Sequence, residues 1–116
     1  MKITKWLEEF NNSWTNHEVD TVMSLFTEDV EYWENPFLKI KSYTDLKNEW
    51  QFINKQSNIE LITTIKLSSR DMHVVLWELS YLDEANTLQT WAGTYIIGLN
   101  DSGKCYYFHH TGEKKN

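Results

Sequence analysis

Residues 59–67 read Ile-Glu-Leu-Ile-Thr-Thr-Ile-Lys-Leu, and this stretch decides the fold of the chain. Ile, Leu and Thr at the odd-numbered positions alternate with a second set that includes Glu60 and Lys66, which is the two-residue period of a β-strand. Before Ser57, apolar residues recur instead at every third or fourth position, the spacing of one helical face. The sequence therefore predicts helices in its first half and a sheet in its second.

Three helical segments are expected before Ser57. In the first, Ile3, Phe10 and Trp14 belong to an apolar face, and polar residues occupy the other face. Ser42 and Asp45 have the spacing of a capping box, which indicates the start of the third helix. The expected helices span residues 3–15, 19–27 and 43–55.

Strands joined by turns are expected in the rest of the chain, after one early strand that stops at Pro36. The sequence Asn-Asp-Ser-Gly at 100–103 is a strong turn signal before the last strand. An antiparallel sheet is therefore expected, in a single α+β domain of residues 1–113 followed by a short basic tail at 114–116. The expected strands span residues 30–33, 59–67, 73–82, 87–99 and 104–110.

Composition narrows the classes of function. The chain has 116 residues with a formal net charge of −6, which disfavours a nucleic-acid partner. No apolar stretch is long enough to span a membrane. The single cysteine, Cys105, forms no internal disulfide, so a cytoplasmic location is expected. Six Trp, six Tyr and five Phe are more rings than a small core needs, so some are expected to line a cavity or an interface.

The stretch Leu-Phe-Thr-Glu-Asp-Val-Glu-Tyr-Trp-Glu-Asn-Pro-Phe at 25–37, together with Gly93-Thr94-Tyr95 and the 100–104 turn, carries a family resemblance. The chain resembles the nuclear-transport-factor-2-like superfamily and, within it, the SnoaL-like group that includes ketosteroid isomerases and polyketide cyclases. The resemblance implies a cone-shaped, curved antiparallel sheet of the cystatin-like type, with three N-terminal helices on its concave face. It also implies an apolar pocket for a small molecule and a homodimer through the outer faces of the sheets.

The catalytic residues of ketosteroid isomerase carry over only in part. The residue before the corner proline, where that enzyme has its basic Asp, is Asn35, and an amide cannot take a proton. An ungapped count from Phe26 places Glu34 there instead, and both alignments remain open. The two oxyanion-donor positions fall on Phe10, which cannot donate, and on Tyr95, which can. The resemblance therefore does not predict steroid isomerisation.

His109 and His110 are expected to point to opposite faces of the last strand, so they cannot hold one metal together. Counting from the preceding turn places His110 on the pocket face, where a histidine suits acid–base chemistry. His17 and His73, at element ends, are expected at the surface. The predicted catalytic residues are Glu34, Tyr95 and His110, and the predicted ligand-lining residues are Phe10, Trp14, Trp33, Asn35, Trp91 and Phe108. No metal or cofactor motif is present.

Each of these residues also has a purely structural interpretation. Glu34 fits a capping or dimer-rim carboxylate, Tyr95 and His110 fit ordinary strand packing, and the tryptophans fit a core or a dimer interface. Three functions therefore stay open: a cofactor-independent enzyme acting on a small apolar molecule, a module that binds such a molecule, or a dimeric assembly domain. A buried acid or histidine with a shifted pKa favours the first, a large pocket without converging polar groups the second, and a filled pocket the third.

Overall fold

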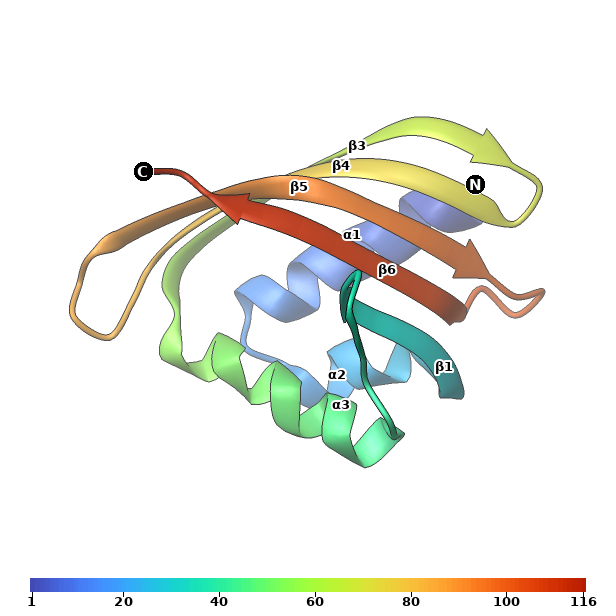
Figure 1. Ribbon diagram of the computed structural model, residues 1–116, viewed down its shortest axis with the longest axis horizontal. Coiled ribbons are helices and arrows are strands. Elements are labelled where there is room, and N and C mark those ends of the chain that lie inside the picture. The colour runs from blue at the N-terminus through green and yellow to red at the C-terminus, as the bar shows by residue number, and fades with distance from the viewer.

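The computed structural model describes residues 1–116 and consists of one curved six-stranded sheet with the helices beneath its concave face (Figure 1). The strand order across the sheet is β2-β1-β6-β5-β4-β3. This architecture confirms the predicted α+β fold. The elements are α1 (Lys2–Thr15), α2 (Val19–Ser24), β1 (Phe26–Asn35), β2 (Leu38–Lys39), α3 (Tyr43–Trp50), the 3-10 helix η1 (Gln51–Lys55), β3 (Ser57–Ser69), β4 (Met72–Leu82), β5 (Leu88–Leu99) and β6 (Cys105–Lys114).

The element boundaries differ from the expected ones around β1. The second helix, expected to reach residue 27, ends at Ser24, and β1 starts at Phe26. Pairing with β6 explains the change, because the Cys105 N–H donates to the Leu25 carbonyl at 2.8 Å and Phe26 lies opposite Cys105. Non-local strand pairing thus overrides the helical periodicity of this segment.

Other boundaries shift by smaller amounts. The last turn of the third expected helix is the 3-10 helix η1, while Ser42 caps α3 as predicted, since its Oγ accepts from the Asp45 N–H at 3.0 Å. The last strand continues to Lys114, which was expected in a solvated tail, and the N–H of Lys115 still donates to the Thr90 carbonyl.

The expectation of a wholly antiparallel sheet is wrong at one pair of strands. Each strand from β3 to β6 pairs antiparallel with the next strand along the chain, because a turn joins the two. In contrast, β1 runs parallel to β6. A tight turn forces two strands to be antiparallel, whereas β1 and β6 are joined by a long connection that contains α3 and four strands. Their direction was therefore not fixed by any local sequence signal.

The core is an aromatic cluster held between α1 and the concave face. Trp6 and Phe10 stack with 4.8 Å between ring centroids, and Phe108 lies under them on β6. These rings are at most 2% exposed. The apolar face of α1 predicted from the sequence is therefore the face that packs on the sheet.

The outer face of the sheet carries no helix (Figure 1). Glu78 points to this side and is exposed, as are the apolar side chains of Ile62 and Leu76, at 57% and 40%. Alternation along β4 places Val75 and Trp77 on the buried side instead. No helix of the structure is long and apolar enough to cross a membrane.

Candidate functional site

A small cavity, which we call the aromatic cavity, lies between the helices and the concave face of the sheet. Its volume is about 40 Å³. This is room for a few water-sized groups, whereas sites for drug-sized ligands usually have about 300–1,000 Å³. The lining residues come from α1, β1, α3, η1, β5 and β6, and they are Phe10, Trp14, Tyr32, Glu34, Trp50, Phe52, Tyr95, Phe108 and His110.

Strand register brings the three predicted catalytic residues together. Tyr95 on β5 lies directly opposite His110 on β6, with ring centroids 5.9 Å apart. Glu34 reaches the same place from β1, where the neighbouring Trp33 pairs with His109. Phe108 and His110 share the inner face and His109 faces outward, as alternation along the strand predicts.

The Glu34 carboxyl has an unusual environment for an acid. It has no ion-pair partner, because the one salt bridge of the protein joins Lys47 to Asp20. Burial raises the pKa of Glu34 from 4.5 to about 7, and the negative charge of Glu49 adds to the shift. At neutral pH this carboxyl is therefore present in both its protonated and ionised forms.

His110 is held in one tautomer by the backbone of Glu34. Its Nδ1 lies 2.7 Å from the Glu34 carbonyl oxygen, which can only accept, so Nδ1 carries the hydrogen and Nε2 carries the lone pair. Burial lowers the pKa of His110, against the opposing effect of this hydrogen bond, so the ring is neutral at pH 7. The ring stacks on Trp77 with centroids 5.2 Å apart.

Gly112 makes room for this stack. A Cβ at Gly112 would lie 2.5 Å from Cζ2 of Trp77, so any larger residue would push the indole away from β6. The position of the His110 ring thus depends on a backbone position two residues further along the same strand.

Three further polar groups lie at the cavity: the hydroxyls of Tyr32 and Tyr95 and the Nε1–H of Trp50. The Tyr95 hydroxyl makes no hydrogen bond within the protein, although the residue is only 2% exposed. The Trp50 Nε1–H lies beside the Tyr32 hydroxyl, and this contact acts to lower the Tyr32 pKa. A donor without a protein partner, such as the Tyr95 hydroxyl, is suited to an acceptor that enters the cavity.

The ionisation of the two tyrosines is linked to Glu34. Burial raises the pKa of Tyr32 and of Tyr95 well above 10, and the charge of Glu34 is the second cause in both cases. Both hydroxyls therefore stay protonated at neutral pH and remain hydrogen-bond donors. Donors of this kind can stabilise negative charge that develops on an oxygen atom.

Six of the nine residues predicted from the sequence line the cavity, and three do not. Trp33 lies on the opposite face of β1, where its Nε1 donates to Glu31 Oε2 at 2.8 Å. Asn35 is exposed and its Oδ1 accepts from the Phe37 N–H, which holds the proline corner. Trp91 shares a face with Tyr95 but lies four residues away, about 13 Å along a strand. Of the two alignments left open, the structure thus brings Glu34 to the cavity, and Asn35 faces away from it.

Tyr32, Trp50 and Phe52 line the cavity but were not predicted as site residues. Alternation could have found Tyr32, which is two residues before Glu34 on the same strand. Trp50 belongs to the predicted apolar face of its helix, and nothing distinguished it from a core residue. No sequence signal indicated Phe52, which is held by the 3-10 turn after Trp50. No group of three His, Cys, Asp or Glu side chains is placed to hold a metal ion.

Comparison with known proteins identifies the fold. No protein-family model matches the sequence, and no curated protein matches it. Solved structures do match. An NTF2-like protein of unknown function from Exiguobacterium sp. 255-15 is 18% identical, with 97% of this chain and 98% of that chain covered and a TM-score of 0.76. The Δ5-3-ketosteroid isomerase of Mycobacterium sp. is 11% identical, with 98% of both chains covered and a TM-score of 0.76.

A third match is a Mycobacterium tuberculosis protein in complex with estradiol-17β-hemisuccinate. It is 15% identical, with 93% of this chain and 91% of that chain covered and a TM-score of 0.74. The chain therefore has the NTF2-like fold expected from its sequence, the fold that ketosteroid isomerase also has. Because one fold supports many reactions, this likeness establishes the architecture and not the activity.

Proposed function

We propose that the aromatic cavity is the active site of a cofactor-independent enzyme that transfers protons on a small, largely apolar molecule bearing a carbonyl or hydroxyl oxygen. The observation that carries the proposal is the Glu34 carboxyl, which has no cationic partner and a pKa of about 7. A general acid–base group works best when its pKa is close to the working pH. A carboxyl kept only for capping or packing gains nothing from this environment.

The surrounding residues supply the other parts of such a reaction. Ionised Glu34 accepts a proton from a carbon next to the carbonyl, and the C–H electron pair moves toward the oxygen. The hydroxyls of Tyr95 and Tyr32 donate to that oxygen as its negative charge develops. Glu34 then returns the proton to the substrate. The lone pair on His110 Nε2 provides a second proton acceptor, fixed in place by the Nδ1 hydrogen bond.

Cavity size limits the substrate. A steroid does not fit in about 40 Å³. Aromatic rings reduce the volume at one end, where the Phe52 ring lies 5.7 Å from that of Trp14, edge-on, and 5.3 Å from that of Trp50, between centroids. Phe52 is 42% exposed, so it can turn outward at low cost. We therefore propose that the substrate is a small carbonyl compound that enters past Phe52.

The test is deuterium exchange into a panel of small ketones and enones in D₂O, followed by proton NMR. We expect the protein to catalyse exchange at carbons next to the carbonyl, and Tyr95→Phe to slow it. Saturable binding of the same compounds without exchange would favour the alternative function, a module that only binds its ligand. Neither exchange nor binding would contradict both functions.

We also propose that two copies of the chain associate through the outer faces of their sheets. The exposed Ile62 and Leu76 lie in a shallow depression of about 360 Å³ on this face, with Ala92 beside them. Apolar surface of this kind without a covering helix is characteristic of a contact with another chain. A dimer in light scattering at micromolar concentration that Leu76→Lys converts to a monomer supports the proposal, and a wild-type monomer contradicts it.

A further inference from the structure

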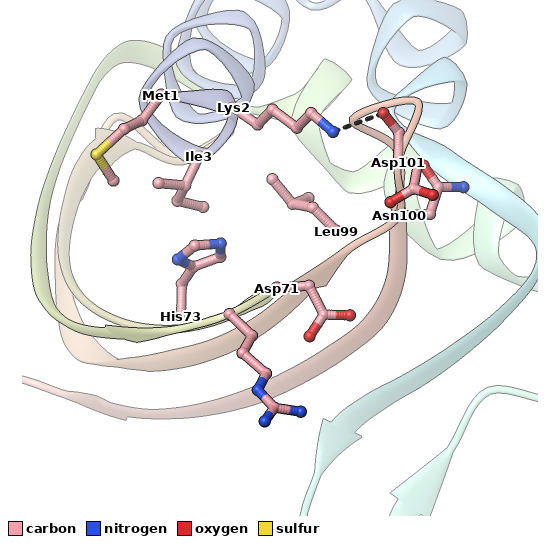
Figure 2. Close-up of a pocket in the computed structure, with 9 residues that line it drawn as sticks. Met1, Lys2, Ile3, Asp71, His73, Leu99, Asn100 and Asp101 are labelled. Carbon is pink, nitrogen blue, oxygen red and sulfur yellow. Dashed lines mark hydrogen bonds between the residues drawn. The ribbon is translucent and has the colours of Figure 1, made fainter.

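A second hollow, which we call the cleft, lies at the opposite end of α1 from the aromatic cavity (Figure 2). Its volume is about 410 Å³, and it is bounded by the start of α1, the β3–β4 turn and the β5–β6 turn. Its floor offers no open apolar surface, because Ile3 and Leu99 are 1% and 3% exposed. His73, expected at the surface, is 6% exposed, and its Nδ1 lies 2.8 Å from Ser68 Oγ. Neither the floor nor the histidine of the cleft therefore indicates a ligand, in contrast to the wall of the aromatic cavity.

The sheet side of the aromatic cavity is built from two adjacent rows of residues that cross the strands. In one row, Tyr95 on β5 lies opposite His110 on β6. In the next row, Trp77 on β4 lies opposite Gly93 on β5, which in turn lies opposite Gly112 on β6. Across these three strands, Trp77 therefore provides the whole side-chain content of its row.

The two glycines leave room for the Trp77 indole to lie across the sheet. A Cβ at Gly112 would lie 2.5 Å from Cζ2 and 2.8 Å from Cη2 of Trp77. A Cβ at Gly93 would clash with the carbonyl oxygen of Thr111 on β6. Because neighbouring strands are about 4.8 Å apart, the indole extends over β5 and reaches the second strand away from its own.

The indole contacts both polar rings of the neighbouring row. It stacks on Tyr95 with 5.4 Å between centroids and 15° between planes, and on His110 with 5.2 Å and 20°. The Tyr95 and His110 rings are themselves 5.9 Å apart and tilted by 35°. Each ring is thus closer to parallel with the indole than with the other ring, so the indole is the surface that sets the tilt of both.

No hydrogen bond holds the indole in this position. Trp77 is 3% exposed, and its Nε1–H has no partner in the protein. A buried donor without a partner destabilises the folded state, and a phenylalanine would avoid that loss. A phenyl ring is shorter than an indole, however, and would end over β5 without reaching Gly112 and the His110 ring. The reach of the indole across the sheet therefore accounts for a tryptophan at this position.

The indole supplies a constraint on His110 that its hydrogen bond does not. The bond from Nδ1 to the Glu34 carbonyl oxygen fixes one nitrogen but leaves the ring free to rotate about the direction of that bond. Contact with the flat face of the Trp77 indole removes this rotation. The direction of the Nε2 lone pair is therefore set by the two contacts together.

We propose that Trp77 is a positioning residue. Its indole, laid over Gly93 and Gly112, holds the His110 and Tyr95 rings at the angle at which Nε2 of one and the hydroxyl of the other act on the same substrate. Its effect on catalysis rests on the function proposed above, whereas the placement of the two rings does not.

The experiment compares Trp77→Phe with Trp91→Phe in the deuterium-exchange reaction. Trp91 is the matched control, because its Nε1–H is also buried without a partner and its ring takes no part in the stack. Trp77→Phe should lower kcat about tenfold or more and leave KM within about twofold, because the groups that bind substrate remain and only their orientation is lost. Trp91→Phe should leave both constants within about twofold of wild type. Equal losses in the two variants, or no loss in Trp77→Phe, overturn the proposal.

A second measurement reports the placement of the ring without any activity. The ¹⁵N shifts of the His110 ring should show the wild-type proton on Nδ1, and in Trp77→Phe both shifts should move toward the average of the two tautomers. Loss of the indole ring current alone does not mix tautomers. Unchanged tautomer shifts in Trp77→Phe overturn the proposal, even if kcat falls. If the wild type catalyses no exchange, the function proposed above fails, and these shifts still decide whether Trp77 places the ring.

Gly112→Ala keeps the test decisive if Trp77→Phe does not fold. It retains the indole but pushes it away from β6, so kcat should fall and the His110 tautomers should mix as in Trp77→Phe. Gly98→Ala is the control, because its Cβ would meet only the movable ends of the Met72 and Tyr106 side chains, and it should change neither quantity. Wild-type kcat and tautomer shifts in Gly112→Ala would overturn the proposal.

Discussion

The aromatic cavity and the cleft lie at the two ends of α1, and they differ in volume by about tenfold, at roughly 40 and 410 Å³. The smaller one holds three groups whose pKa values are raised by burial, Glu34, Tyr32 and Tyr95. The raised pKa values, and not the volume, are therefore what support the proton chemistry proposed for the aromatic cavity.

The largest expected effect tests the smaller hollow. Glu34→Gln should slow proton exchange by about 10²–10⁴-fold, because the amide cannot accept a proton. The measurement is the NMR exchange rate with a reactive ketone. Glu31→Gln, on the outer face of the same strand, is the matched control. If Glu34→Gln catalyses exchange at the wild-type rate, the aromatic cavity is not the active site.

Enlarging the cavity should reduce stability. Phe10 is fully buried and its ring lies 5.9 Å from Tyr95 and 5.5 Å from Trp50, so Phe10→Ala should lower the free energy of unfolding by roughly 3–5 kcal/mol. Urea denaturation measures this. Phe37→Ala, at a ring that is 95% exposed, makes the same change and should cost less than about 0.5 kcal/mol. Similar losses at both positions would show that the cavity wall is not tightly packed.

A smaller effect is expected where the backbone supports the cavity. Gly112→Ala places a methyl group against the Trp77 indole and should cost about 1–3 kcal/mol and shift the His110 ring resonances. Gly98→Ala is the comparison, because its added Cβ would meet the ends of the Met72 and Tyr106 side chains, which can move. A larger loss at Gly98 than at Gly112 would contradict this account of the stack.

The smallest expected effect is a pH dependence of stability. Because the folded-state pKa of Glu34 is raised from 4.5 to about 7, the folded protein holds its proton more tightly than the unfolded chain does. Stability is therefore lost as the pH rises from about 4.5 to 7, and the loss is complete above 7. With allowance for partial exposure, the wild-type free energy of unfolding should fall by about 1 kcal/mol over this pH range, and this fall should be absent in Glu34→Gln. Parallel stability curves of the two proteins from pH 4.5 to 8 would argue against it.

Sequence periodicity predicted most of the fold, since the alternation after Ser57 and the apolar face of α1 are both observed. It could not predict the parallel pairing of β1 with β6, because the two strands are distant in sequence and no turn sets their direction. Of the six cavity residues that were predicted, Tyr95, Phe108 and His110 were found because parity along a strand and the family resemblance agree for them. Trp33 and Trp91 were misplaced because aromatic character alone does not indicate which face, or which part of a strand, a ring occupies.

The cleft was not visible in the sequence at all. Its residues come from three separate segments, and His73 looked like a surface residue at the end of a strand. Its burial depends on α1 crossing that end of the sheet, which only the tertiary structure reveals. The dimer and the cytoplasmic location remain predictions.

The central claim, that Glu34 is poised for proton transfer at neutral pH, is tested most directly by its own titration. The chemical shift of the Glu34 side-chain carboxyl carbon, followed by ¹³C NMR from pH 3 to 9 and assigned with Glu34→Gln, should show a midpoint near 7. A midpoint near 4.5 for Glu34 would contradict the account, because the carboxyl would then be an ordinary ionised side chain at neutral pH.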